Sequence, residues 1–221
     1  MENFFKMNKY NVKKKLFVVS AICFVVCMAV LPQKAQAQSI LQFWKAMPDS
    51  ILPYLDSNKR AELMDYANMG VRAEVKNLLN EKVTLDTLTS DFTKITLSEG
   101  HTMQIKRLPV ENEDSVFCVV RTFGTDNPES TINIYHADWS KRSKIEFDPQ
   151  QITGQIVSKE NINQEKMNLD KYVPVIAAYL DAHSDEMTLK VSYLLLSKEE
   201  KQLLKDKEMQ LNVKWNGKMF N

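Results

Sequence analysis

The sequence predicts an α+β protein, with N-terminal helices packed on an antiparallel β meander and a mixed C-terminal strand–helix–strand part. Two observations predict this class. Apolar residues recur at helical spacing in the first part of the chain, and from Asp91 onward the spacing falls to two, as in strands with one buried face. The connections between the predicted strands are short and rich in turn residues, which favours antiparallel neighbours.

The helices come first. A short helix is expected from Ser39, with Pro48 interrupting it. Capping side chains at 56–58 begin a longer helix, which ends near Gly70. Residues 71–80 fit either a helical face or a connector.

Four strands are then expected, marked by alternating apolar residues. These are Ile95 and Leu97, then Met103 and Ile105, then Val116, Cys118 and Val120, and finally Ile132 and Ile134. Joined by short loops, they form a four-stranded meander.

The C-terminal part is less regular. Residues 141–168 are polar and form either a long connection or a boundary between two subdomains. Residues 171–183 fit a helix or a strand, whereas Met187–Leu196 alternates as a strand. Ser197 then caps a charged helix.

A last strand is expected over Met209–Trp215. The dipeptide Asn216-Gly217 that follows is typical of a type I′ turn, after which the chain can fold back for a few residues.

The first 37 residues have the order of a cleavable export signal. Lysines at 13–15 precede an apolar run over 16–31, which as a helix would reach roughly 24 Å, short of the roughly 30 Å bilayer core. Ala35-Gln36-Ala37 supplies a cleavage pattern. We therefore expect a mature chain, 38–221, that forms a single α+β domain without a membrane span; an uncleaved anchor is the alternative.

Removal of this segment changes the composition of the chain. Cys23 and Cys27 leave with it, and neither follows a small residue as a lipoprotein cysteine would, so a periplasmic or envelope-associated protein that is not a lipoprotein is expected. Cys118 alone remains and cannot form an internal disulfide. Six lysines and one glutamate also leave, so the formal net charge changes from +1 to −4, which argues against nucleic acid as a partner.

No catalytic, cofactor-binding or metal-binding residue can be assigned from the sequence. Cys118 lies mid-strand among valines, where a buried thiol is expected. On a strand, His136 and Asp138 would share one face, but two ligands are fewer than a metal site requires. Because Ile132 and Ile134 occupy the same face, His136 is expected to end a row of core residues, with Asp138 at the strand exit. His101 is expected at a hairpin tip and His183 at a turn, both in solvent.

Several short stretches resemble an exported Bacteroidales-type protein family of unknown function. They are Met47–Ile51, Ala73–Asn77, Tyr135–Trp139, Leu196–Glu200 and Trp215–Phe220. The resemblance implies an envelope-associated domain and brings no catalytic residues. In architecture alone, two helices before a four-stranded meander are similar to one repeat of the β-lactamase-inhibitor-like proteins, which bind other proteins.

Two functional hypotheses follow. The first is a non-enzymatic binding or interaction domain with a protein or glycan ligand; the second is a hydrolase with an acidic cleft. A pocket with converging, perturbed acidic or histidine side chains would favour the enzyme, and a groove lined with exposed aromatic residues would favour binding. The oligomeric state is not predicted.

Overall fold

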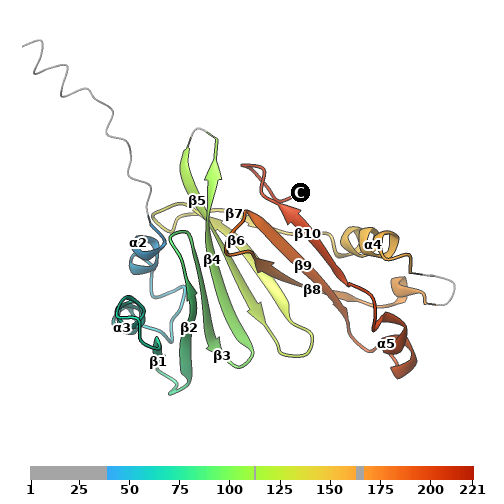
Figure 1. Cartoon of the computed structure of the whole chain (residues 1–221), viewed down its shortest axis with the longest axis horizontal. Helices are drawn as coiled ribbons and strands as arrows, with labels where there is room; N and C mark the ends of the chain where they lie inside the picture. The colour runs from blue at the N-terminus through green and yellow to red at the C-terminus, as the bar shows by residue number, and fades with distance from the viewer. Residues whose placement is uncertain (1–38, 112, 163–166) are drawn as a thin grey trace, which may run out of the picture. The chain divides into compact units, whose positions relative to one another are not determined.

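A computed structural model describes residues 39–111, 113–162 and 167–221 (Figure 1). The predicted signal segment and its cleavage point after Ala37 lie outside the described residues. The α+β class is confirmed, and most of the regular structure is β.

The described residues form two antiparallel sheets and several helices. The larger sheet has seven strands in chain order: β1 (Glu74–Lys76), β2 (Lys82–Leu88), β3 (Phe92–Ser98), β4 (His101–Val110), β5 (Glu113–Phe123), β6 (Glu129–Tyr135) and β7 (Lys141–Ile145). The smaller sheet has the order β10 (Gln210–Lys214), β9 (Glu186–Tyr193), β8 (Pro174–Leu180). The helices are α2 (Ile40–Lys45), α3 (Ser57–Asn68), α4 (Pro149–Lys159), a 3₁₀ turn η1 (Leu169–Lys171) and α5 (Lys198–Leu204).

The centre of the larger sheet is buried on both faces. Along β5, Val116, Cys118 and Val120 enter one core, while Phe117 and Val119 enter the other. Helices α2 and α3 cover the second face, and β8–β10 with α4 cover the first (Figure 1). Apolar residues therefore occupy consecutive positions along β5, as expected for a strand without a solvent-facing side.

Three stacked aromatic rings attach the helical layer to the sheet. The Phe43 ring of α2 lies between Phe117 of β5, at 3.8 Å between centroids, and Trp139, at 3.9 Å. The Trp139 indole N–H donates to the Phe43 carbonyl oxygen at 2.7 Å. The stack thus joins α2 to the central strand and to the turn after β6.

Side-chain hydrogen bonds join the second sheet to the first. The backbone N–H groups of Ala178 and Leu180 in β8 donate to Ser130 Oγ at 2.9 Å and to Gln104 Oε1 at 3.0 Å. The buried Lys106 ammonium donates to the Ala182 carbonyl at 3.1 Å and lies 3.0 Å from an Asp91 carboxylate oxygen. These polar groups satisfy one another inside the interface.

The larger sheet has more strands than predicted. Residues 74–76 and 82–88 pair as β1 and β2, although a helical face or connector is predicted for the first segment and no strand for the second. Val83 and Leu85 do alternate with polar residues in β2. Two alternating apolar residues among threonines and charged residues predict a strand only weakly. In the folded protein, pairing with β3 stabilises the strand.

The polar stretch 141–168 is not a plain connection in its described part. It contains β7 and then α4, which begins with Asp148 as its cap and places Ile152 and Ile156 in the core between the sheets. Of the two readings of 171–183, the strand is correct, because β8 pairs with β9 over its whole length. Pro174 is the first residue of β8, a position in a strand where proline is tolerated although it has no backbone N–H to donate.

The chain folds back near its end as expected, but through a different turn. An antiparallel bridge joins Trp215 to Phe220, so the loop between them has four residues. All four are described, and of these Gly217 alone has a positive φ, at +94°. A type I′ turn requires positive φ at both central residues, so this prediction is wrong.

Replacing Phe43 by alanine should destabilise the protein strongly. The change removes a fully buried ring between two others, and we expect the free energy of unfolding to fall by about 3–5 kcal/mol in urea denaturation. Met69→Ala, at an exposed site, should change it by less than about 0.5 kcal/mol. Equal small effects of both changes would contradict the role given to the stack.

Candidate functional site

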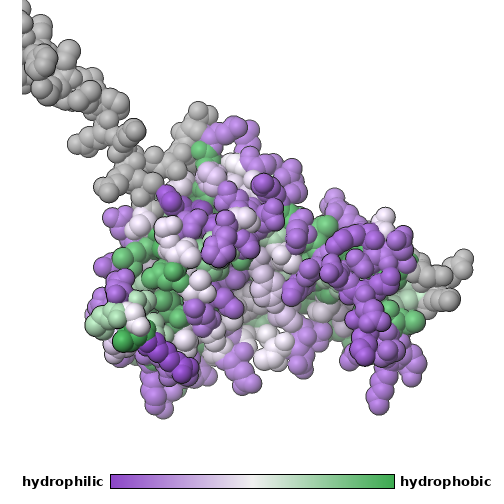
Figure 2. All heavy atoms as spheres, viewed as in Figure 1, coloured by the Kyte–Doolittle hydropathy of each residue, from purple (hydrophilic) through white to green (hydrophobic). Residues whose placement is uncertain are grey.

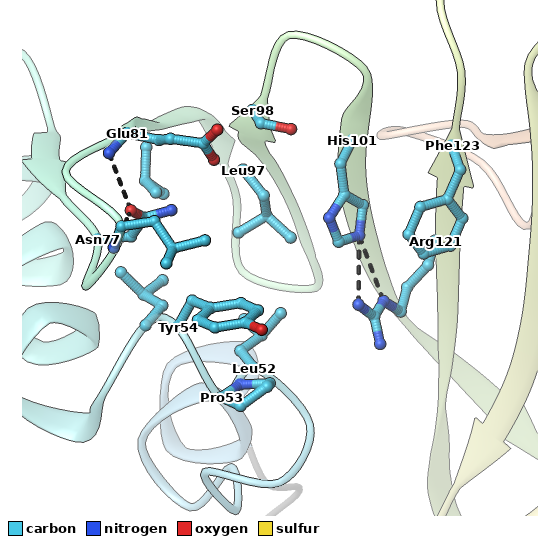
Figure 3. A pocket seen from close by; sticks show the side chains of 13 residues that line it. Leu52, Pro53, Tyr54, Asn77, Glu81, Leu97, Ser98, His101, Arg121 and Phe123 are labelled. Atoms are coloured by element: carbon cyan, nitrogen blue, oxygen red, sulfur yellow. Dashed lines mark hydrogen bonds between the residues drawn. The ribbon is translucent and has the colours of Figure 1, made fainter.

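A concave pocket of about 260 Å³ lies beside the helical layer, where the ends of several strands meet the turns around residues 50 and 79 (Figure 3). Three groups of residues line it. The 50s turn gives Leu52, Pro53, Tyr54 and Leu55; the β1–β2 turn and β2 give Asn77, Leu79, Glu81 and Val83; the ends of β3, β4 and β5 give Leu97, Ser98, His101, Arg121 and Phe123.

A buried arginine fixes the 50s turn. Arg60 of α3 donates to the carbonyl oxygens of Leu55 at 2.7 Å and Met47 at 2.6 Å, and lies 2.9 Å from an Asp49 carboxylate oxygen. Its guanidinium therefore bonds both ends of the segment between α2 and α3. This holds Leu52 and Leu55 in the core and Tyr54 at the surface.

The opposite wall is the β1–β2 turn, which Asn77 organises. Its side-chain oxygen accepts the backbone N–H groups of Leu79 and Glu81, both at 2.9 Å, and Asn80 has a φ of 63°, which asparagine tolerates well. The Leu78 N–H donates to the Tyr54 carbonyl at 2.9 Å. The two turns are thus hydrogen-bonded to each other.

The pocket has an apolar floor and an apolar rim. Leu52, Leu55, Val83 and Leu97 form the floor and belong to the core under α2 and α3. The rim side chains are Tyr54, Leu79 and Phe123, which remain 55%, 57% and 43% exposed. Apolar area of this kind on a concave surface is typical of a binding site.

The β4–β5 wall carries the polar groups. His101 and Phe123 are paired across the strands, and their rings stack at 4.3 Å between centroids. The Arg121 Nε and Nη2 atoms lie 3.4 and 3.3 Å from His101 Nε2 (Figure 3). The Arg121 Nη1 atom donates to the Ile51 carbonyl at 3.4 Å. Gly124, with a φ of +99°, ends β5 directly after Phe123.

His101 is neutral at pH 7. Burial, and then the charge of Arg121, lower the pKa of His101 to about 4. Its Nε2 atom is therefore free to accept a hydrogen bond from the guanidinium. Burial also lowers the pKa of Arg121 from its usual value, but a guanidinium remains charged at any physiological pH.

The five side chains considered from the sequence lie in different parts of the fold and do not form one site. Cys118 is fully buried in a core, as predicted, and burial raises the pKa of its thiol far above the usual value. His183 is at an exposed turn, also as predicted. His101 begins β4 directly after the β3–β4 turn, as predicted, but the expected exposure to solvent is wrong, because the ring is half-buried and stacked.

For His136 and Asp138, the position of Asp138 beyond the end of the strand is as predicted, but the shared strand face is not. They lie in the turn after β6 rather than on a strand, with Trp139 N–H donating to the His136 carbonyl and Asp138 bonded to Ser140. Across the described residues, no group of three or more His, Cys, Asp or Glu side chains is placed to hold a metal ion.

Arg121 is one of several pocket residues, with Tyr54, Leu79 and Phe123, that the sequence did not indicate. It continues the row of Phe117 and Val119, which faces the helical core, so its position in that row is the one available signal. A charged residue that follows two buried ones along the same face marks the place where the core opens to solvent.

Other apolar side chains are exposed far from the pocket residues in sequence. Val173, Leu194 and Leu195 stand at the start of β8 and after β9, and Leu195 is 93% exposed with a φ of 66°. In Figure 2, apolar side chains gather around α2, α3 and the first strands, while the surface around α5 is largely hydrophilic. In the described part of the chain, no helix has the length and apolar character needed to cross a bilayer.

The fold and pocket together define an α+β protein with two antiparallel sheets and an apolar, arginine-bearing pocket. The chain belongs to a family described as "Protein of unknown function (DUF3256)", whose model matches residues 32–220. It is also similar to a solved structure of a domain of an uncharacterised protein from Porphyromonas gingivalis W83. That match has a TM-score of 0.58 and 21% identity, covers 82% of this chain and 96% of the other, and supports the fold alone. A comparison with curated proteins found no match.

The titration of His101 should differ from that of an ordinary histidine. Following its ring protons by NMR should give a pKa of about 4. The unfolded chain gains this proton near pH 6.5, whereas the folded protein does so only near pH 4, so this contribution to the free energy of unfolding decreases as pH falls through that window. The free energy of unfolding of the wild type, relative to that of His101→Gln, should therefore decrease as pH falls from 6.5 to 4. Titration of His101 near pH 6.5 would contradict the described geometry.

Proposed function

We propose that this protein is an exported, non-enzymatic binding domain of the cell envelope, and that its ligand occupies the pocket between the 50s turn and the β4–β5 wall. One observation carries the binding proposal: Tyr54, Leu79 and Phe123 surround a buried apolar floor while remaining about half exposed. A ligand that covered these rims would remove apolar area from water, which is the main favourable term in such binding.

The composition of the pocket supports binding rather than hydrolysis. A glycosidase-type site needs two carboxylates across a cleft, and Glu81 is the one carboxylate among the lining residues. A thiol nucleophile needs a lowered pKa and access to solvent, whereas Cys118 is buried with a raised pKa. The groups that line this pocket are therefore suited to holding a ligand.

Export is proposed from the lysines, apolar run and Ala-x-Ala pattern of residues 1–37. Expression of the full-length chain in a Gram-negative host should yield a product whose first residue is Gln38. N-terminal sequencing of the envelope fraction checks this. An intact Met1 on the purified protein would contradict export by cleavage.

Shortening one rim side chain should weaken binding of a neutral apolar probe. We expect octanol to bind the wild-type pocket in NMR titrations and Leu79→Ala to weaken that binding roughly fivefold to tenfold, because up to three carbon atoms of contact are lost.

Leu195→Ala is the matched control for this experiment. Leu195 is also an exposed leucine, but it does not line the pocket, so the same change there should alter octanol binding by less than twofold. Equal effects of the two variants, or shifts on octanol addition confined to residues outside the pocket, would contradict the proposed site.

A further inference from the structure

In the described part of the chain, two cationic side chains are fully buried, and each lies beside a carboxylate. Arg60, 2% exposed, lies 2.9 Å from Asp49, and Lys106, also 2% exposed, lies 3.0 Å from Asp91. Such pairing offsets the cost of removing a charge from water. At both sites, a carboxylate of the same chain therefore balances the buried positive charge.

Arg121 is treated differently. It is half-buried, and within the described residues it forms no ion pair; its guanidinium carbon lies over the Phe123 ring, 5.4 Å from the centroid, and its polar contacts are the neutral His101 ring at 3.3–3.4 Å and the Ile51 carbonyl at 3.4 Å. The last of these is long for a hydrogen bond to a charged group. The guanidinium therefore keeps a net positive charge and unused donors beside an apolar floor.

His101 orients this charge without adding to it. Its ring is fixed by stacking on Phe123, and its Nε2 atom accepts from the guanidinium. A protonated imidazole would repel Arg121, whereas the neutral ring holds it in place. The β4–β5 wall thus presents one positive charge in a fixed orientation.

The opposite side of the pocket is unsuitable for an anion. Glu81 is on the β1–β2 turn, across from Arg121, and the remaining lining groups there are apolar or amide (Figure 3). A ligand with one negative end is therefore oriented, with its charge toward Arg121 and away from Glu81. A ligand with two negative ends would bring one of them near Glu81.

The volume limits the size of the ligand. An apolar cavity of about 150 Å³ holds benzene, so a pocket of about 260 Å³ accommodates a somewhat larger group. We propose that the ligand is a monocarboxylate with a compact apolar body of roughly eight carbons, whose carboxylate pairs with Arg121 and whose apolar part covers Leu52, Leu55, Val83 and Leu97. This inference rests on the proposed binding function and adds the chemical class of the ligand.

Matched probes of equal length test the charge preference. With protein purified after expression of the full-length chain, at pH 7 and low salt, we expect calorimetry or NMR titration to show octanoate binding about tenfold to a hundredfold more tightly than octanamide. Octanedioate should bind more weakly than octanoate because of Glu81.

Variants at Arg121 test whether this residue causes the preference for a ligand with a carboxylate. Arg121→Gln should remove most of the preference for octanoate over octanamide, measured as the ratio of the two affinities in the same variant, and Arg121→Lys should retain part of that preference. Arg72→Gln, at an exposed arginine outside the pocket, is the control and should leave the affinities for octanoate, octanamide and octanol unchanged.

The outcomes separate the two proposals. Equal binding of octanol, octanamide and octanoate would overturn the carboxylate inference and leave the pocket a binding site. Failure of all three probes to bind would overturn the proposed function and the inference with it. A preference for octanoate that survives in Arg121→Gln would also overturn the role given to Arg121.

One further arm distinguishes the source of the carboxylate. The same chemistry occurs in a free acid and at the C-terminus of a peptide with a last apolar residue. Acetyl-Ala-Phe with a free carboxylate and its amidated form should show whether a chain terminus is accepted. We expect the free acid to be preferred, since the pocket volume leaves little room for a preceding residue; tighter binding of the peptide acid would overturn the preference for a free acid but support the pairing with Arg121.

Discussion

Burial of the central strands on both faces is the constraint on which the rest of the structure depends. Strands β4 and β5 send alternate side chains into two separate cores, so each face of the sheet requires its own cover. The second sheet with α4 supplies one cover, and α2 and α3 supply the other. The Phe43–Phe117–Trp139 stack attaches the helical layer to the larger sheet. The hydrogen bonds from β8 to Gln104 and Ser130 attach the smaller sheet to it.

The pocket is a direct consequence of this arrangement. The row containing Phe117 and Val119 continues along β5 beyond these core residues to Arg121 and Phe123, which line the pocket. The turns that lead into α3 and join β1 to β2 close the sides. The resulting surface combines core leucines and valines below with a guanidinium that, unlike the charged groups of Arg60 and Lys106, has no carboxylate partner among residues 39–111, 113–162 and 167–221.

Elements whose structure is determined by local sequence patterns could be predicted from the sequence. The strand character of β5 and the capped start of α3 follow from alternation and from Asp56, and both are confirmed. Segments whose state depends on partners were harder to predict: β2 becomes a strand by pairing with β3, and β8 by pairing with β9. The site depends on partners most of all, because the environment of His101 is set by Phe123 and Arg121, which are adjacent only after β4 and β5 pair.

A crystal structure of the protein soaked with octanoate at pH 7 is the measurement that tests the central claim most directly. The account predicts the carboxylate within hydrogen-bonding distance of Arg121, the alkyl chain against Leu52, Leu55, Val83 and Leu97, and the ring of His101 still stacked on Phe123. An empty pocket, or a ligand whose carboxylate lies on the Glu81 side, would contradict it.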